Sequence, residues 1–401
     1  MSKRLTILAA LLLALVALSL TPTSVAAQAL DRPLPMSILL PRLLDNTGNC
    51  GDIQGTKTGR LGDFCAGAPQ GGSAGSASSI TIETRTSGGG EDAVRRRLER
   101  LKAGKAASAD DTELGRGFGM FVTTEYQSLN KSTSIFELGY EQNTTGATVG
   151  VDYSFGRLGV LGAAVNYMHE FGDFAGQTGG YNNDLYSFIL YGTVTPLPSL
   201  FVDLNAGYTR KEYGIDRRVS IANIPTSVPV FLGRIEGDTH SDDFRLGARI
   251  GYDFTLGALT FGPRIGASYR ESAIAGFKET GNTGIELIYG DQTVVSLTTT
   301  AGVFTSYAIS TRFGVIVPQL TGEYIHEFAN DQRTVPFTFV NAPAGTYRFL
   351  TEPPDRDYFT VGGGAVLQLP SGLTPFVNYV EVLGQTRRTQ RTVTLGLRFG
   401  F

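Results

Sequence analysis

The chain contains three histidines, His169, His240 and His326, and the neighbours of His240 in the sequence could support chemistry. The stretch "THSDD" at residues 239–243 puts His240 close to Asp242 and Asp243. A histidine beside carboxylates can act as a general base or hold a metal ion. The polar base of a loop has the same composition without any chemistry, and we favour that interpretation.

The other short motifs do not match reactive sites. "DNTGNCGD" at residues 45–52 offers oxygen ligands but lacks the glycine and terminal-glutamate spacing of a calcium loop. "CGDIQG" at residues 50–55 has no serine after its aspartate, so an esterase motif is missing. The chain has no G-x-S-x-G motif, phosphate-binding loop, zinc-type spacing or dinucleotide fingerprint. We therefore expect no enzymatic activity, no metal and no cofactor.

The composition indicates β-structure with many turns. Of the 401 residues only 18% are charged, and the chain has 51 Gly, 24 Phe and 17 Tyr but no Trp. The formal net charge is −3, and the lysines and arginines are scattered along the chain. This distribution gives no signature of nucleic-acid binding.

The N-terminus predicts export from the cytoplasm. Lys3 and Arg4 precede an apolar run over residues 5–20, and Ala27 ends a stretch of small residues of the kind that a signal peptidase reads. We predict a signal peptide over residues 1–27, because the run is shorter than the roughly 20 residues that span a membrane. In an oxidising compartment, Cys50 and Cys65 could form one small disulfide loop.

Two different segments follow the signal peptide. Residues 28–90 are rich in Gly, Ser, Thr and Pro, which predicts a flexible passenger or linker. Residues 91–111 begin with a helix, "EDAVRRRLERLKAGK", whose apolar residues form one narrow stripe. The helix is either a solvated linker or a basic helix that lies in an acidic tunnel. Its candidate pore residues are Val94, Arg96, Leu98, Arg100 and Leu101.

From residue 112 onward, apolar residues recur at every second position. In residues 242–254, Phe244, Leu246 and Ile250 belong to an apolar series that alternates with charged residues and glycines. The same pattern predicts twelve strands, near residues 118–126, 146–155, 158–168, 183–194, 199–210, 242–254, 258–270, 293–309, 312–326, 357–369, 374–382 and 391–401. A soluble β-sandwich has the same periodicity.

The connections between the predicted strands favour a membrane barrel over a sandwich. Tight joins such as "GR" and "TLGA" alternate with connections that read as mostly long and hydrophilic, such as residues 211–241 and 327–356. Short turns at one end, long loops at the other, an even strand number and a signal peptide are typical of outer-membrane barrels. A closed barrel also supplies the terminal strand, residues 393–401, with a partner.

The strand parity assigns a mixed set of charges to the lumen. The predicted inward acidic residues are Glu125, Asp152, Asp203, Asp243, Asp253 and Glu323, and the predicted basic residues are Arg245, Arg249, Arg264, Arg270 and Arg398. A basic helix over residues 94–105 would find partners of opposite charge there. We therefore predict that this helix passes through the barrel.

Several stretches resemble the β-domain, or translocator, of bacterial autotransporters. The matching stretches are "GVDYSFGRLGVLGAAVNY" at residues 150–167, "RLGARIGYDFTLGALTFGPRIGASY" at 245–269, "GFKETG" at 276–281, "YAISTRFGVIVPQLTGEYIHEF" at 307–328, "PDRDYFTVGGG" at 354–364 and "TLGLRFGF" at 394–401. The resemblance covers residues 113–401. The last stretch, with Leu395, Leu397, Phe399 and Phe401, is similar to the insertion signal that the outer-membrane assembly machinery reads.

The resemblance implies a 12-stranded antiparallel transmembrane β-barrel with an N-terminal helix through the lumen. It implies type V secretion, in which the barrel over residues 112–401 carries the short segment 28–90 to the surface of a Gram-negative bacterium. We expect as partners outer-membrane lipid, the barrel assembly machinery and periplasmic chaperones, but no nucleic acid, and a monomer. The alternatives are a helix-plugged channel or structural barrel without a passenger, and a barrel hydrolase that uses His240 and Asp242.

Overall fold

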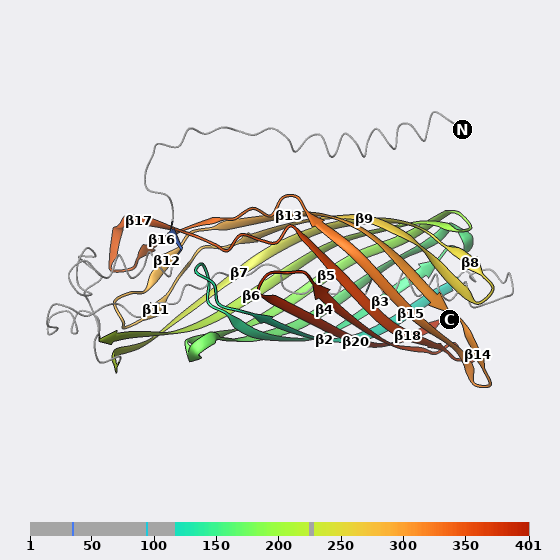
Figure 1. Ribbon diagram of the computed structural model, residues 1–401, viewed down its shortest axis with the longest axis horizontal. Helices are drawn as coiled ribbons and strands as arrows, with labels where there is room; N and C mark the ends of the chain where they lie inside the picture. The colour runs from blue at the N-terminus through green and yellow to red at the C-terminus, as the bar shows by residue number, and fades with distance from the viewer. Residues whose placement is uncertain (1–33, 36–93, 95–116, 224–227, 401) are drawn as a thin grey trace, which may run out of the picture. The chain divides into compact units, whose positions relative to one another are not determined.

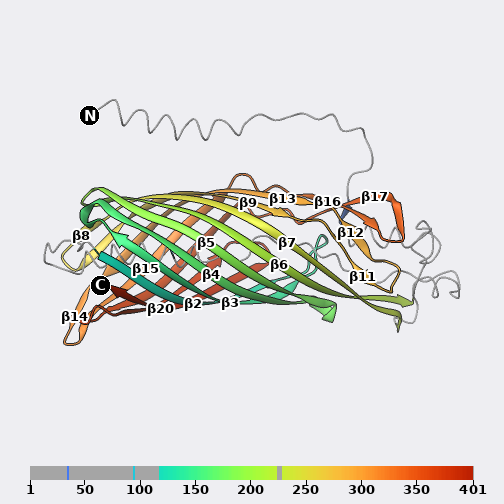
Figure 2. The ribbon, with the colours of Figure 1, turned by 180° about the vertical axis from the view of Figure 1, so that it is seen from behind.

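The computed structural model describes residues 34, 35, 94, 117–223 and 228–400 of the chain. These residues form two β-sheets, and the larger sheet is antiparallel and curls into a barrel whose strands are tilted (Figures 1 and 2). Within the described ranges, no helix combines the length and the apolar character that crossing a membrane requires.

Twelve long strands make up the barrel wall within the described part of the chain. They are β2 (Gly117–Lys131), β3 (Tyr140–Ser154), β4 (Gly159–Phe174), β5 (Gly179–Leu197), β6 (Leu200–Asn223), β7 (Val228–Tyr252), β9 (Leu259–Ile274), β13 (Gln292–Tyr307), β15 (Gly314–Glu327), β18 (Asp357–Gln368), β19 (Thr374–Leu383) and β20 (Arg388–Gly400). Each pairs with the next along the chain, and β20 pairs with β2 from Gly119↔Gly400 to Lys131↔Arg388. The ring is therefore closed, as the sequence predicted.

The two ends of the barrel differ in how the strands are joined. Gly117 and Gly400 lie at the end that carries the joins β3–β4, β5–β6, β7–β9, β13–β15 and β18–β19, which we call the turn end. It includes the short elements η1 (Gly156–Leu158), β8 (Phe254–Leu256) and β14 (Ile309–Thr311). The opposite end, which we call the loop end, includes η2 (Ala175–Gln177) and β11 (Thr280–Gly281).

Alternation along each strand separates a lipid face from a lumen face. On β20, Leu395 and Leu397 are 52% and 43% exposed on the outer face. Thr394, on the lumen face of the same strand, is fully buried. Neighbouring residues of a strand point to opposite faces, so this pattern fixes which side chains face inward. Apolar side chains cover the outside because lipid replaces water there.

Aromatic rings on the inner wall lie over glycines of the neighbouring strand. The register-matched pairs are Phe121–Gly150, Tyr191–Gly162, Tyr181–Gly172, Phe201–Gly251 and Phe376–Gly396. A Cβ atom built at Gly396 would lie 2.3 Å from the ring of Phe376, and one at Gly150 would lie 2.3 Å from Phe121. Glycine is required at these positions because the ring occupies the place of a side chain, and the ring in turn covers the glycine backbone.

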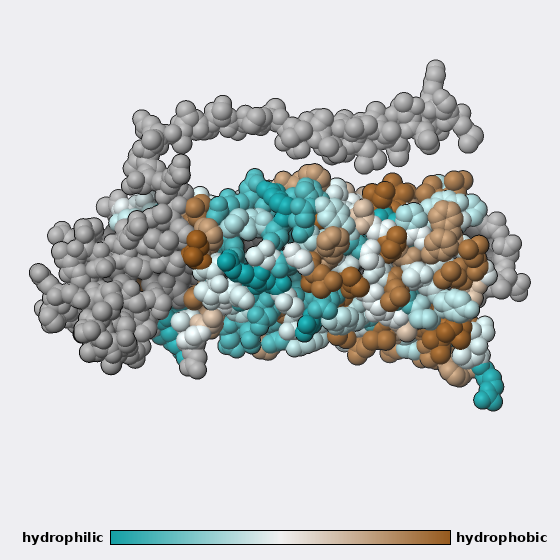
Figure 3. Space-filling model, in the orientation of Figure 1, coloured by the Kyte–Doolittle hydropathy of each residue, from teal (hydrophilic) through white to brown (hydrophobic). Residues whose placement is uncertain are grey.

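The outer surface of the barrel carries a zone of exposed apolar side chains, which we call the apolar belt. Two bands of aromatic side chains border it. Phe118, Tyr153 and Phe155 contact one another near the turn end, at ring-centroid distances of 4.9 Å. Tyr126 lies eight residues along β2 from Phe118, which is about 26 Å of strand and about 20 Å of height at a tilt of about 40°. Figure 3 shows the consequence on one face, where hydrophobic residues gather on the half of the barrel nearer the C-terminus.

The strands continue well beyond the apolar belt, which corrects two of the predicted connections. Residues 211–241 were expected to be a long hydrophilic loop, but β6 and β7 stay paired from Lys211↔Ser241 to Asn223↔Val228. The joins 175–178 and 384–387 are also short rather than long. The prediction failed because the outward face turns polar in water, which removes the apolar alternation although the strand continues.

A second, smaller sheet lies at the loop end of the barrel. Its strand order is β1 (Leu34–Pro35), β17 (Ala342–Leu350), β16 (Thr334–Phe339), β12 (Leu287–Tyr289) and β10 (Phe277–Lys278). The long connections 275–291 and 328–356 supply four of these strands, and β1 pairs parallel to β17. The predicted loop 327–356 therefore exists as a connection but is largely folded.

Candidate functional site

The charged residues predicted for the lumen lie on the inner face of the wall. Glu125, Asp152, Asp203, Asp243, Glu323, Arg245, Arg249 and Arg264 are buried, and Arg270, Asp253 and Arg398 are partly buried. Asp253 follows β7 directly, and the other ten come from seven strands that lie far apart in the sequence. The barrel thus gathers charges of both signs around one polar space.

Ion pairs concentrate on the wall formed by β7, β9 and β15. Arg249 Nη2 lies 2.6 Å from Glu323 Oε1, and Arg264 Nη2 donates to Asp253 Oδ1 at 2.5 Å. Asp243 accepts a hydrogen bond from Arg270 Nη2 at 2.9 Å. An unpaired charge would be costly to bury, so these pairs keep the guanidinium groups of the wall compatible with a narrow lumen.

The acidic residues of β2 and β3 have different neighbours. Thr394 Oγ1 donates to Glu125 Oε2 at 3.3 Å, and the Tyr191 hydroxyl donates to Asp152 Oδ2 at 3.0 Å. Carboxylates on this side of the wall offer negative charge to a cationic segment in the lumen.

One residue of the predicted pore helix belongs to the described part of the chain. Val94 is helical and only 1% exposed, and it forms a cluster with Phe121, Val160, Ala164, Ile189 and Tyr191. Its partners are buried inner-wall side chains of β2, β4 and β5 near the turn end. The apolar stripe of residues 91–105 thus has at least one contact inside the lumen.

Several other predictions fall outside the described residues. They concern the signal peptide 1–27, the segment 28–90 apart from Leu34 and Pro35, Cys50 and Cys65, the helix residues Arg96, Leu98, Arg100 and Leu101, and Phe401. The remaining residues of the insertion signal, Leu395, Leu397 and Phe399, lie exposed on the outer face of β20. That face lies at the seam where the last strand of the barrel meets the first.

The arrangement around His240 does not support the hydrolase hypothesis. The expected loop-to-strand junction is wrong, because residues 239–243 lie within the continuous strand β7. Asp242 instead accepts hydrogen bonds from the Tyr208 hydroxyl at 2.6 Å and from Arg210 Nη1 at 2.9 Å. Asp243 points into the lumen, on the face opposite His240. Among the described residues, no group of three or more His, Cys, Asp or Glu side chains could hold a metal ion.

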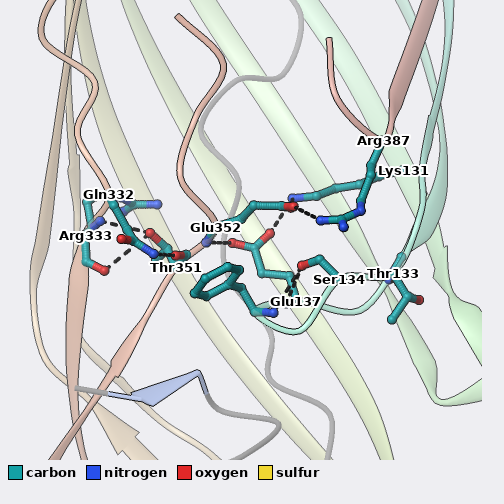
Figure 4. A network of polar contacts seen from close by, with 11 residues as sticks. Lys131, Thr133, Ser134, Glu137, Gln332, Arg333, Thr351, Glu352 and Arg387 are labelled. Carbon is teal, nitrogen blue, oxygen red and sulfur yellow. Dashed lines mark hydrogen bonds and ion pairs between the residues drawn. The ribbon is translucent and has the colours of Figure 1, made fainter. Parts of the chain in front are cut away.

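A polar network at the loop end joins three connections that the sequence did not relate (Figure 4). Lys131 Nζ contacts Glu137 and lies 3.2 Å from Glu352 Oε2. Glu137 Oε1 accepts a hydrogen bond from the backbone N–H of Glu352 at 3.0 Å, and Arg387 lies 3.3 Å from the Glu352 carboxylate. A hollow of about 400 Å³ borders this network. We call it the rim lock, because it ties residues 132–139, 351–356 and 384–387 together.

Lys131→Met is expected to open the rim lock. The substitution keeps the apolar part of the side chain but removes the cation that the buried carboxylates of Glu137 and Glu352 share. We expect it to destabilise the rim lock by about 1–3 kcal/mol. Amide hydrogen exchange of residues 134–139 should become faster. Arg391→Met is the matched control, because its 3.0 Å pair with Glu381 is exposed and worth at most about 1 kcal/mol. Equal exchange in both variants would contradict a locking role.

A buried clamp fastens residues 275–291 to the extended strand β6. Arg217 donates from Nε to Glu279 Oε1 at 2.8 Å and from Nη2 to Oε2 at 2.5 Å, and both side chains are almost fully buried. Glu279 Oε2 also accepts from the backbone N–H of Leu287 at 2.8 Å. Burial alone would lower the pKa of the Arg217 guanidinium, but the charge and hydrogen bonds of Glu279 outweigh it and raise the pKa. We call this pair the loop clamp.

The small sheet at the loop end has an aromatic face. Tyr347, Phe337, Tyr289 and Phe277 are register partners in one row across β17, β16, β12 and β10. Ring centroids are 5.6 Å apart for Phe337–Tyr347 and 4.7 Å apart for Phe277–Tyr289. This sheet was not predicted from the sequence. Its signal was the alternation in "TVPFTF" followed by "TYRFL", which predicts a hairpin inside the stretch that was read as a loop.

A family model for the autotransporter beta-domain matches residues 120–380, which is most of the barrel. The chain belongs to this family. It is therefore an outer-membrane protein of a Gram-negative bacterium, and its barrel is a translocator, a transport unit. The resemblance inferred from the sequence is confirmed.

Solved barrels of two other autotransporters have the same fold. The translocator domain of NalP from Neisseria meningitidis matches 80% of this chain and 100% of that domain, with 15% identity and a TM-score of 0.60. The β-domain of the Bordetella autotransporter BrkA matches 71% of this chain and 100% of that domain, with 15% identity and a TM-score of 0.52. The twelve-stranded closed barrel is thus shared at very low sequence identity.

A relative found by sequence is the uncharacterized protein YaiT of Salmonella typhimurium. It is 27% identical over 123 residues. The match covers 30% of this chain and 11% of YaiT. The similarity is therefore confined to a small part of a much longer protein.

Proposed function

We propose that this barrel exports and displays its own N-terminal segment, residues 28–90, at the cell surface, and that residues 91–105 stay in the lumen as a tethering helix. The observation that carries the proposal is the burial of Val94 against inner-wall side chains. A valine of a strongly basic stretch reaches that cluster only if the stretch enters the lumen. The carboxylates of Glu125 and Asp152 offer complementary charge to its arginines.

The order of contacts along the chain supports the same proposal. Leu34 and Pro35 pair with β17 at the loop end, Val94 contacts the lumen wall, and Gly117 starts β2 at the turn end. A chain that begins at the loop end and continues through the lumen to β2 has the route of an exported segment. A segment that stayed in the periplasm would have no reason to reach the loop end.

The direct test is the accessibility of an epitope placed after Gly75. On intact cells, we expect antibody labelling of the epitope and its loss on treatment with external protease. Labelling only after permeabilisation would refute display and would favour the plugged channel or structural barrel. Ionic conductance of the purified, intact protein would point in the same direction.

Insertion is proposed to depend on the barrel assembly machinery, with periplasmic chaperones holding the unfolded chain before it inserts as a monomer. Leu395, Leu397, Phe399 and Phe401 would form the signal, because they present apolar side chains on one face of the terminal strand. Phe401→Ser should lower the amount of heat-modifiable barrel in the outer membrane several-fold. Thr394→Ser, on the lumen face of the same strand, is the control. Unchanged barrel levels in Phe401→Ser would count against the signal.

A further inference from the structure

The outer edge of the small sheet is occupied by the chain's own N-terminal segment. β17 pairs on one side with β16 and on the other with β1, in the parallel register Leu34↔Phe349 and Pro35↔Leu350. An unpaired strand edge presents a row of free N–H and C=O groups that readily accepts an extended peptide. β1 is such an added strand, and it comes from a part of the chain more than 300 residues away in the sequence.

The position of β17 that pairs with Leu34 is apolar. Phe349 is fully buried and is the register partner of Leu34 on one side and of Val335 on the other. Directly opposed residues of a sheet share one face, so Phe349 and Val335 form an apolar row beside the aromatic row of Tyr347, and the register sets Leu34 next to this row. The one apolar stretch of the otherwise polar segment 28–90, residues 34–44, begins at this contact. The apolar composition of residues 34–44 therefore favours this segment as the occupant.

We infer that the exported segment is pinned to the barrel at both of its ends. The pore helix holds one end, and strand addition of Leu34 and Pro35 to β17 holds the other, so the displayed part is a closed loop rather than a free tail. This inference rests on the proposed export. It adds that the extracellular sheet is a docking surface for the chain's own leading end.

An engineered disulfide tests the docking. In a Cys50→Ser, Cys65→Ser background, Pro35→Cys is combined with Leu350→Cys, its register partner. Adjacent strands are about 4.8 Å apart, which is within the Cα separation of about 4.4–6.8 Å that a disulfide spans. The control combines Pro35→Cys with Arg348→Cys, which lies on the same face but about 8 Å away. Both chains carry a protease site after Gly75 and an epitope before residue 34.

Intact cells are oxidised and then treated with the protease. We expect the N-terminal fragment to stay bound to the barrel on non-reducing gels in the Leu350→Cys chain, at about tenfold the level of the control, and to leave it after reduction. Cleavage on intact cells with release of the fragment from both chains would overturn the docking but leave display intact. Cleavage only after permeabilisation would overturn display, and the docking with it.

A second cysteine pair tests the same register if the barrel with the first pair inserts poorly. Leu34→Cys with Phe349→Cys probes the same register on the opposite face of the sheet. A crosslink in this pair supports the docking, and its absence in a normally inserted barrel contradicts it.

Discussion

Glu279→Ala is expected to lower the free energy of local unfolding of residues 275–291 by about 3–5 kcal/mol, because it leaves the Arg217 guanidinium buried without its carboxylate partner. The loss includes the hydrogen bond from the Leu287 backbone N–H to Glu279 Oε2. The backbone N–H of residue 279 donates to Leu287 O at 2.8 Å, so its hydrogen exchange reports the local opening directly. The expected acceleration is between about two and four orders of magnitude.

Two controls separate the loop clamp from a general effect of lost charge. Glu236→Ala removes the carboxylate of an exposed pair, in which Arg234 lies 3.1 Å away, and should cost at most about 1 kcal/mol. The double variant Arg217→Met with Glu279→Leu removes both buried charges and should recover most of the stability. The loop-clamp hypothesis fails if Glu279→Ala and Glu236→Ala accelerate exchange equally.

Leu320→Arg is expected to destabilise the folded barrel by about 2–4 kcal/mol, because it places a charge at the mid-depth of the lipid face. Leu320 is 63% exposed on β15, four residues from Tyr324 of the aromatic band nearer the loop end. Lipid cannot solvate a guanidinium as water does, so the cost arises from burial in hydrocarbon and not from lost packing. Equilibrium unfolding by urea in lipid vesicles measures it.

Phe328→Arg is the matched control for depth. Phe328 follows β15 directly, lies on the far side of Tyr324 from Leu320, and is 54% exposed. The same chemical change there should cost about 0–1 kcal/mol, because the arginine reaches water. Comparable losses at both positions would show that the apolar belt does not extend across Leu320.

The twelve strands were predictable because lipid and lumen impose a strict period of two. Phe244, Leu246 and Ile250 face lipid while Arg245 and Arg249 face the lumen. The alternation within one segment is therefore enough to identify a strand and its two faces. The same logic failed between residues 211 and 241. Above the belt both faces meet water or other protein, and the outward positions are free to be polar.

Contacts between distant segments could not be read from the sequence. Lys131, Glu137, Glu352 and Arg387 look like ordinary loop charges until the barrel brings their connections together at one rim. Arg217 and Glu279 are likewise unremarkable when they are taken singly, although they form a buried bidentate pair. The His240 hypothesis shows the reverse case, because Asp242, its neighbour in the sequence, bonds to Tyr208 and Arg210 of the adjacent strand.

The sequence by itself determined the family, the strand number, the inward and outward face of each strand and the mixed charge of the lumen. These properties depend on local alternation, which each strand carries independently of the others. Only the tertiary structure decided the rim lock, the loop clamp, the aromatic sheet and the strand added by Leu34. Those features join residues up to about 300 positions apart, and their partners are selected by barrel closure and register rather than by any pattern within a single segment.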